Sequence, residues 1–297
     1  MTFLNFLISG ISLGSIYAII ALGYTMVYGI AKMLNFAHGD VIMVGAYICF
    51  YAVSRFDLPP LAGVILAMLV CTVLGMVVER LAYKPLRQAP SLAVLITAIG
   101  VSYFLQNMAL LLWSSNPKVF PGFFASASGD TGVELFGGQL KISYVIMVTI
   151  AACIVIMLAL TWFTGKTKLG KAMRAASFDV ETAQLMGINA DRVISFTFCI
   201  GSALAAAAGV LVGVYYNSID PLMGIMPGLK AFVAAVLGGI GILPGAVAGG
   251  IILGVIEALV SGFISSTFRD AAAFAILILV LLFKPSGLFG KNTREKV

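Results

Sequence analysis

Long stretches without a charged residue are the feature that most limits what this chain can fold into. Six windows contain no Asp, Glu, Lys or Arg, at residues 3–31, 58–78, 88–117, 142–165, 193–219 and 231–256. A helix that rises about 1.5 Å per residue needs about 20 apolar residues to cross the hydrocarbon core of a bilayer. Every window reaches that length, so the sequence predicts a protein that crosses a membrane several times.

The composition supports this prediction and excludes a soluble globular domain. Of 297 residues, 61% are hydrophobic and 10% are charged, whereas an average soluble domain has roughly 25% charged residues. Backbone polar groups must be paired inside lipid, which favours helices for the apolar windows. We therefore expect an all-α, polytopic transmembrane helical bundle that forms one domain over residues 1–297. Helices are predicted at residues 4–28, 39–53, 60–78, 91–113, 142–163, 193–216, 227–241, 244–263 and 271–283.

The basic residues fall mostly on one side of this scheme. The opposite side carries Arg55, Lys118, Lys141 and Arg269, Lys230 lies at the edge of a helix, and the other 13 Lys and Arg residues share one side. Basic loops stay in the cytoplasm, which places the N-terminus outside and the C-terminus inside. The scheme allows eight or nine spans, because residues 227–241 either cross or re-enter, and this orientation favours nine. The net charge of +6 needs no nucleic-acid partner.

Two hydrophilic segments are long enough to do more than connect spans. Residues 114–141, rich in Gly and Pro, form the predicted extracytoplasmic loop, with irregular or partly extended structure. Residues 164–192 form the predicted cytoplasmic loop, which has helical character instead.

The cytoplasmic loop contains a short helix with its own start and stop. Asp179 can cap the first turn, and Glu181 complements the positive end of the helix dipole. Gly187 suits the left-handed position after the last turn, while Ala183 and Met186 belong to an apolar stripe. This helix is expected to dock into a groove on a partner, although an ordinary interfacial helix has the same features.

The spacing E-x-A-x-x-x-G in this loop resembles the EAA loop of ABC importer permeases, which couples to a cytosolic ATPase. The apolar tail with proline that follows the loop in many such permeases is absent from residues 188–198. Gly165, Lys166 and Thr167 imitate the end of a phosphate-binding loop, but Leu160 stands where its first glycine is required. ATP and Mg are therefore expected in partner subunits, with no cofactor in this chain.

The N-terminal third carries the most distinctive motifs. The run LGSIYAIIALGYTMVYG at residues 13–29 and the run NFAHGD at residues 35–40 closely resemble the signature of permease subunits of high-affinity branched-chain amino acid ABC importers. The resemblance continues at Glu79, Arg80, Tyr83, Pro85 and Leu86, in the sequence LIT of residues 95–97, and at Pro285, Gly287, Leu288 and Phe289. It covers almost the whole chain.

This resemblance implies a non-catalytic subunit that translocates leucine, isoleucine and valine across the bacterial cytoplasmic membrane. The implied partners are a second homologous permease, two cytosolic ATPase subunits, an extracytoplasmic substrate-binding protein and the lipid bilayer. Related permeases are assigned to urea, amides or broader sets of amino acids, so the substrate stays open. An ion-coupled secondary transporter is the alternative of a different class, and a membrane enzyme would need a nucleophile and base that the spans lack.

Several polar residues at membrane depth are candidates for the pathway or for a hinge. Glu257 lies among apolar residues, where a charge is costly unless it is paired or faces water. Asp40 is not one of these candidates, because its local role explains it: it can cap or favourably charge the helix at residues 39–53. The other candidates for the pathway or the hinge are Tyr24, Asn35, His38, Thr97, Gln106 and Asn107.

Glycines at GxxxG spacing predict close helix packing, either within the chain or against a partner permease. They are Gly209, Gly213, Gly241, Gly245, Gly249, Gly250 and Gly254. The four cysteines have no metal-binding spacing and His38 has no cluster of ligands around it. No metal site and no disulfide is predicted.

Overall fold

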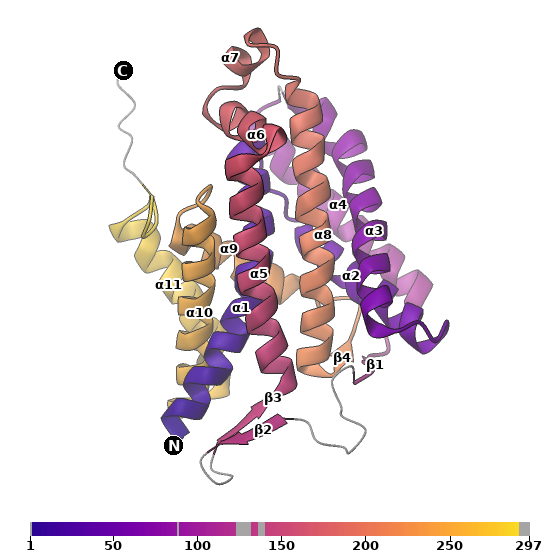
Figure 1. Ribbon diagram of the computed structural model, residues 1–297, viewed down its shortest axis with the longest axis vertical. Helices are drawn as coiled ribbons and strands as arrows, with labels where there is room; N and C mark the ends of the chain where they lie inside the picture. The colour runs from indigo at the N-terminus through magenta and orange to yellow at the C-terminus, as the bar shows by residue number, and fades with distance from the viewer. Residues whose placement is uncertain (1, 88, 123–131, 136–139, 291–297) are drawn as a thin grey trace.

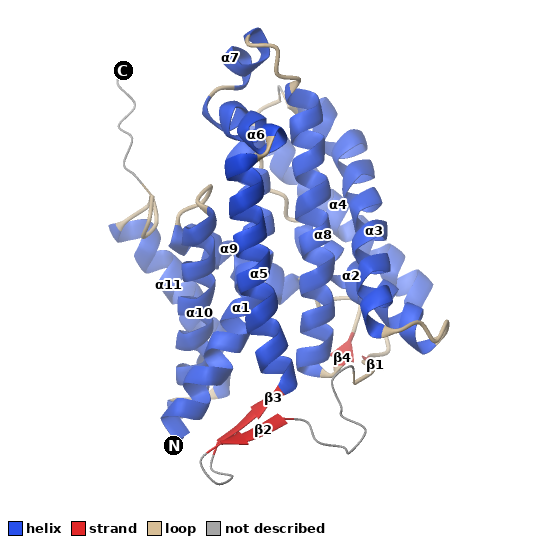
Figure 2. Cartoon of the chain, in the orientation of Figure 1, coloured by secondary structure: helices blue, strands red, loops and turns tan. Residues whose placement is uncertain are grey.

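The computed structural model describes residues 2–87, 89–122, 132–135 and 140–290. Its elements follow the apolar windows closely (Figures 1 and 2). The helices are α1 (Thr2–Ala31), α2 (His38–Ser54), α3 (Pro60–Val78), α4 (Ser91–Trp113), α5 (Tyr144–Lys166), α6 (Lys168–Phe178), α7 (Val180–Leu185), α8 (Ala190–Tyr216), α9 (Ile225–Gly238), α10 (Leu243–Phe263) and α11 (Arg269–Phe283), with short helical turns at Glu79–Tyr83, Lys84–Leu86 and Ser266–Phe268.

The predicted helical bundle is confirmed. Among the described residues, seven helices are long and apolar enough to cross a membrane: α1, α3, α4, α5, α8, α10 and α11, where α3 and α11 include the adjoining short turns. Two apolar helices are shorter, α2 with 17 residues and α9 with 14. At about 1.5 Å per residue they reach only about 25 Å and 21 Å, less than the core of a bilayer. The predicted eight or nine spans thus correspond to seven full spans and two shorter helices.

α1 lies at the centre of the bundle. It packs most extensively against α10 and also contacts α8, α9 and α5. Its residues from Ile16 to Leu22 are almost completely buried, whereas α3, α4 and α11 expose many large apolar side chains. Because apolar exposure of that extent is unfavourable in water, these outer helices are suited to lipid or to a partner subunit.

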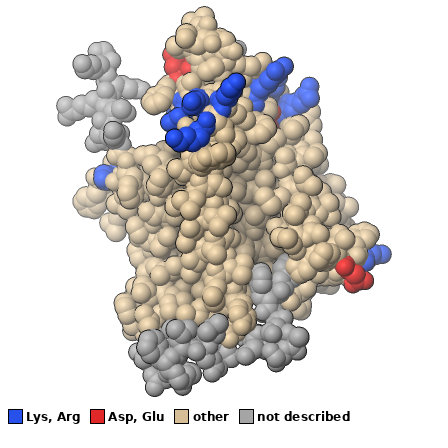
Figure 3. Space-filling view, in the orientation of Figure 1, with Lys and Arg blue, Asp and Glu red and all other residues tan. Residues whose placement is uncertain are grey.

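The two ends of the bundle differ in structure and charge. α6 and α7 lie at one end, and the N-terminus lies at the other with the strands (Figure 1). Lys and Arg side chains gather at the end that carries α6 and α7 (Figure 3), as the loop prediction required. Lys291, Arg294 and Lys296 fall outside the described residues.

Within the predicted extracytoplasmic loop, the described parts are short strands joined by irregular segments. β1 (Lys118–Val119) pairs antiparallel with β4 (Ser218–Ile219), which follows α8. β2 (Gly132–Leu135) pairs antiparallel with β3 (Leu140–Ser143), which leads into α5. These short ladders hold the ends of α8 and α5 beside the loop.

Candidate functional site

The two short helices, α2 and α9, both begin inside the bundle, where their first turns meet. A Cβ atom on Gly23 would lie 2.7 Å from the His38 ring, so His38 lies beside a residue about two helical turns before the end of α1. Residues 32–37 therefore fold back along α1. A Cβ atom on Gly39 would lie 2.7 Å from the carbonyl oxygen of Gly224, and one on Gly228 would lie 3.0 Å from the Gly39 Cα atom. Glycine at these positions therefore brings two helix N-termini, and their partial positive charges, into the interior.

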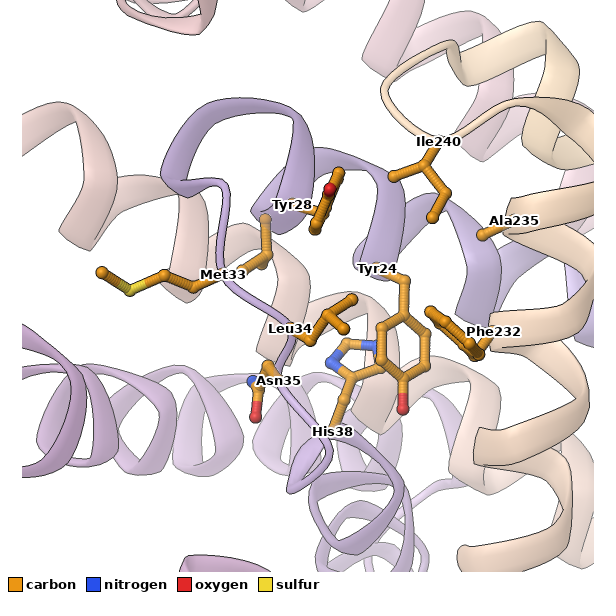
Figure 4. Close-up of a pocket in the computed structure, with 10 residues that line it drawn as sticks. Tyr24, Tyr28, Met33, Leu34, Asn35, His38, Phe232, Ala235 and Ile240 are labelled. Carbon is orange, nitrogen blue, oxygen red and sulfur yellow. The ribbon is translucent and has the colours of Figure 1, made fainter. Parts of the chain in front are cut away.

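Three of the predicted site residues, Tyr24, Asn35 and His38, line one small pocket beside this junction (Figure 4). The rings of Tyr24 and His38 lie 4.5 Å apart, and the Tyr83 hydroxyl donates a 2.8 Å hydrogen bond to Asn35 Oδ1. The pocket holds about 10 Å³, which is room for about one water. These side chains pack the point where the chain reverses direction and leave no space for a solute.

A larger cavity of about 210 Å³ lies between α1, α2, α4 and α9. Asp40, only 2% exposed, and Gln106 both line it. Gln106 Nε2 donates to Asp40 Oδ1 at 2.9 Å and to Ser102 Oγ at 3.0 Å. Asp40 makes no side-chain cap on α2 but lies in its first turn, where a carboxylate complements the dipole. Gln106 thus both faces a cavity and bonds a neighbouring helix.

Thr97 and Asn107, the other two candidates on α4, are placed differently. In the part of the chain that the structure describes, neither residue lines the two cavities at the junction. Asn107 is exposed, and its side-chain amide donates a 2.7 Å hydrogen bond to the Tyr103 carbonyl of its own helix. Asn107 therefore bonds within α4 rather than to a neighbouring helix.

Glu257 on α10 is fully buried and sits in a network of charged and phenolic groups. Its Oε2 atom accepts hydrogen bonds from Lys230 Nζ at 3.0 Å, Arg269 Nε at 3.0 Å and the Tyr17 hydroxyl at 3.1 Å. Lys230 also pairs with Asp270 at 2.7 Å. The network joins α1, α9, α10 and α11, and it shows Glu257 paired rather than facing water.

α7 has the start and stop that its sequence predicts. Asp179 Oδ1 accepts hydrogen bonds from the backbone N–H groups of Glu181 at 2.9 Å and Thr182 at 3.2 Å. At the other end, Gly187 has φ +83°, and Gly187 N and Ile188 N donate to the Gln184 and Ala183 carbonyls at 2.9 and 3.0 Å. This pair of bonds is the Schellman arrangement, which a left-handed glycine completes.

The tip formed by α7 and the end of α6 exposes large apolar side chains. Phe178 is 92% exposed, Leu185 87% and Met186 79%, while Ala183 is buried. The apolar stripe expected on this helix is therefore not a single face, because Ala183 packs against the rest of the chain and Met186 faces outward. Hydrogen bonds from the Thr182 hydroxyl and N–H lower the pKa of Asp179 below its usual range, so this cap is ionised at neutral pH.

The predicted packing glycines make their contacts inside the chain. Gly250 and Gly254 lie against Ala18 and Gly14 of α1. Gly245 and Gly249 lie against Gly238 and Ala234 of α9, Gly209 lies against Ile42 of α2, and Gly213 lies against Phe120. Gly241 differs from the prediction: with φ +97° it lies in the turn between α9 and α10 rather than in a helix, because Gly239, with φ +103°, ends α9 at Gly238.

Sequence reasoning assigned no role to Lys230 or Arg269, although both bind Glu257. A usable signal was present, since Lys230 is the only charged residue between Asp220 and Glu257. Two isolated opposite charges in apolar sequence are expected to pair. Among the described residues, no group of three or more His, Cys, Asp or Glu side chains is arranged to hold a metal ion.

Comparison with known proteins places the chain in a family. Residues 6–283 match the family described as "Branched-chain amino acid transport system / permease component". The sequence is 45% identical over 305 residues to the high-affinity branched-chain amino acid transport system permease protein LivH of Salmonella typhimurium, covering 99% of this chain and 98% of that protein. The chain belongs to this permease family. The resemblance seen in the N-terminal motifs is thereby confirmed.

Further relatives of this permease agree in coverage and in fold. BraD of Pseudomonas aeruginosa, also a high-affinity branched-chain amino acid transport system permease protein, is 44% identical over 308 residues, with 99% and 98% of the two chains covered. A chain of PsaBC from Streptococcus pneumoniae in complex with Fab superposes with a TM-score of 0.50 at 14% identity, covering 96% of this chain and 92% of that one. At that identity the likeness concerns the fold alone.

Proposed function

We propose that this permease is the non-catalytic transmembrane subunit of an ATP-driven importer that carries leucine, isoleucine and valine across the bacterial cytoplasmic membrane. The observation that carries the proposal is the identity of 45% over nearly the whole chain to a permease named for branched-chain amino acid transport. Urea, amides and a broader set of amino acids are the alternative substrates that the sequence resemblance leaves open.

The proposed complex contains a second homologous permease, two cytosolic ATPase subunits and an extracytoplasmic binding protein. ATP and Mg belong to the ATPase subunits. The outer faces of α3, α4 and α11 carry apolar side chains suited to the bilayer or to the second permease. The basic end of the chain is assigned to the cytoplasm, with the N-terminus outside and the C-terminus inside.

The proposed contact with an ATPase is the apolar tip formed by Phe178, Leu185 and Met186. Exposed apolar side chains on a well-capped helix favour docking into a groove. α6 carries movement of this tip into the bundle because it packs against α1, α5 and α8. α1 in turn contacts α9 and α10, so a displacement at the tip reaches the junction of the two short helices.

The Glu257 network argues against an ion-coupled secondary transporter. Such a transporter needs an ionisable group at membrane depth that exchanges its ion. Glu257 is instead held by Lys230 and Arg269, each at 3.0 Å, so its charge is already compensated. Glu257 therefore gives no support to ion coupling.

The turn after α7 offers the sharpest test of this function. Gly187→Val should reduce ATP-dependent leucine uptake by about tenfold or more, because a β-branched residue at φ +83° is strained by roughly 1–3 kcal/mol and unwinds the end of α7. Gly187→Asn is the matched control, since Asn tolerates this backbone region. Uptake is measured in cells lacking the native gene, with the membrane level of each variant determined. Normal uptake by the Val variant at normal level would exclude α7 as the coupling helix.

A further inference from the structure

The cavity between α1, α2, α4 and α9 has features of a binding site that the small pocket lined by Tyr24, Asn35 and His38 lacks. Its volume of about 210 Å³ far exceeds the ~10–15 Å³ that a single water requires. The polar wall is formed by Asp40, Ser102 and Gln106, and apolar walls are formed by Phe36, Ile99 and Leu229.

Asp40 carries an oxygen atom whose partner is missing. Asp40 is only 2% exposed, and its Oδ1 atom accepts the hydrogen bond from Gln106. Oδ2 has no hydrogen-bond partner among the residues that the structure describes. Buried polar atoms are nearly always paired, and an unpaired carboxylate oxygen is especially unfavourable. A donor that enters the cavity would complete this site.

The charges around the cavity favour a zwitterion with one orientation. Asp40 attracts a positive group, and within the described residues no Lys or Arg lines the same cavity. Ile225 and Gly228, in the first turn of α9, form another wall, and a helix N-terminus favours a negative group. The apolar walls suit an aliphatic side chain.

We infer that this cavity binds the primary ammonium group of an amino acid during translocation. Asp40 Oδ2 accepts a hydrogen bond from the ammonium group, and Gln106 holds the Asp40 carboxylate in place. This inference rests on the proposed function and deepens it, because it names the group of the substrate that the permease recognises. Asp40 is a binding residue in this account, and Gln106 is a positioning residue.

The test places a thiol in the polar wall and measures charge preference without transport. Ser102→Cys is reacted in permeabilised membranes with a cationic reagent, 2-aminoethyl methanethiosulfonate, and with its anionic 2-sulfonatoethyl counterpart. The unsubstituted chain, whose four cysteines are buried, gives the background. Tyr103→Cys, at the exposed mouth of the same cavity, is the second reporter if the first variant does not assemble.

We expect the cationic reagent to react about tenfold faster than the anionic one, because the nearby carboxylate attracts it. Adding Asp40→Asn should abolish the preference, whereas adding Asp57→Asn, in the exposed turn after α2, should leave it intact. Leucine should slow the cationic reaction, and 4-methylpentanoate, which lacks the amine, should not. Equal rates for the two reagents, or equal protection by the two solutes, would overturn the inference.

Uptake separates this inference from the function on which it rests. If the unsubstituted chain restores leucine uptake, Asp40→Asn should reduce it at normal membrane level and Asp57→Asn should not. An unaffected Asp40→Asn variant would overturn the ammonium site while leaving the importer function intact. Absence of uptake by the unsubstituted chain would instead count against the proposed function, and the reagent rates would still decide the charge preference of the cavity.

Discussion

Lys230, Arg269, Glu257 and Asp270 together carry no net charge, and this balance explains how a fully buried Glu257 is tolerated. Each of these four groups has an opposite charge within 3.0 Å. Removing one member of a buried pair leaves the others uncompensated, which costs much more than the pair itself contributes. The four groups therefore act as a unit, and their effect on the stability of the protein depends on the sum of their charges.

Glu257→Gln should lower the free energy of unfolding by up to about 3 kcal/mol, because one positive charge remains in excess. Lys230→Gln combined with Glu257→Gln should be less destabilising than the sum of the single changes, since Arg269 and Asp270 still balance. Glu181→Gln, at an exposed position, is the matched control. Thermal unfolding of the purified variants in detergent measures these differences, and additive losses would show that the groups do not interact.

The cap of α7 gives a prediction for pH. Because hydrogen bonding lowers the pKa of Asp179 in the folded protein, its contribution is fully present above the unfolded pKa, about 3.9, and is lost as pH falls through the folded value. Hydrogen exchange of residues 180–186 should therefore be equally slow from about pH 7 to about pH 5, after correction for intrinsic rates. Asp179→Ala should speed exchange, and Asp179→Asn, which still caps, should not. Loss of protection already near neutral pH would contradict this cap.

At the scale of elements, contact between α1 and α10 depends on glycine. A Cβ atom on Gly254 would meet the backbone of Gly14, and one on Gly250 would lie 2.6 Å from Ala18 N. In lipid, where apolar side chains gain little from leaving the solvent, such close backbone contact provides much of the packing energy.

Gly254→Val should destabilise the bundle by about 1–3 kcal/mol, because the added atoms force α1 and α10 apart. Gly100→Val is the matched control: it also adds an isopropyl group to a helix, but a Cβ atom there meets nothing within 4 Å. The fraction of each variant that survives heating in detergent gives the comparison. Equal survival of both variants would mean that the α1–α10 contact contributes little.

The helices and the cap of α7 were accessible to sequence reasoning because they depend on neighbours along the chain. Charge-free windows locate the spans, and the motif from Asp179 to Gly187 specifies one short helix by local hydrogen bonds. The early starts of α2 and α9 depend on a contact between Gly39 and Gly224, which no local pattern reveals. The same holds for Asp40 with Gln106, which lie on different helices. Lys230 and Glu257 also lie on different helices, but their isolation in apolar sequence was a signal that could have predicted the pair.

For the whole molecule, charge, apolar faces and the two short helices form one consistent arrangement. The end with α6 and α7 carries the clustered Lys and Arg side chains (Figure 3) and the apolar tip proposed to meet an ATPase. The opposite end carries the short strand pairs. Between them, the first turns of α2 and α9 meet beside the larger cavity, so the proposed coupling surface and the proposed substrate site lie on one connected set of helices.

The most direct test of this account is uptake of labelled leucine by cells that lack the gene, compared with cells in which it is restored together with its partners. ATP is depleted in one arm with the membrane potential maintained, and the potential is collapsed in the other with ATP maintained. We expect restored uptake that stops when ATP is depleted and continues when the potential is collapsed. Uptake that follows the potential and ignores ATP would contradict it.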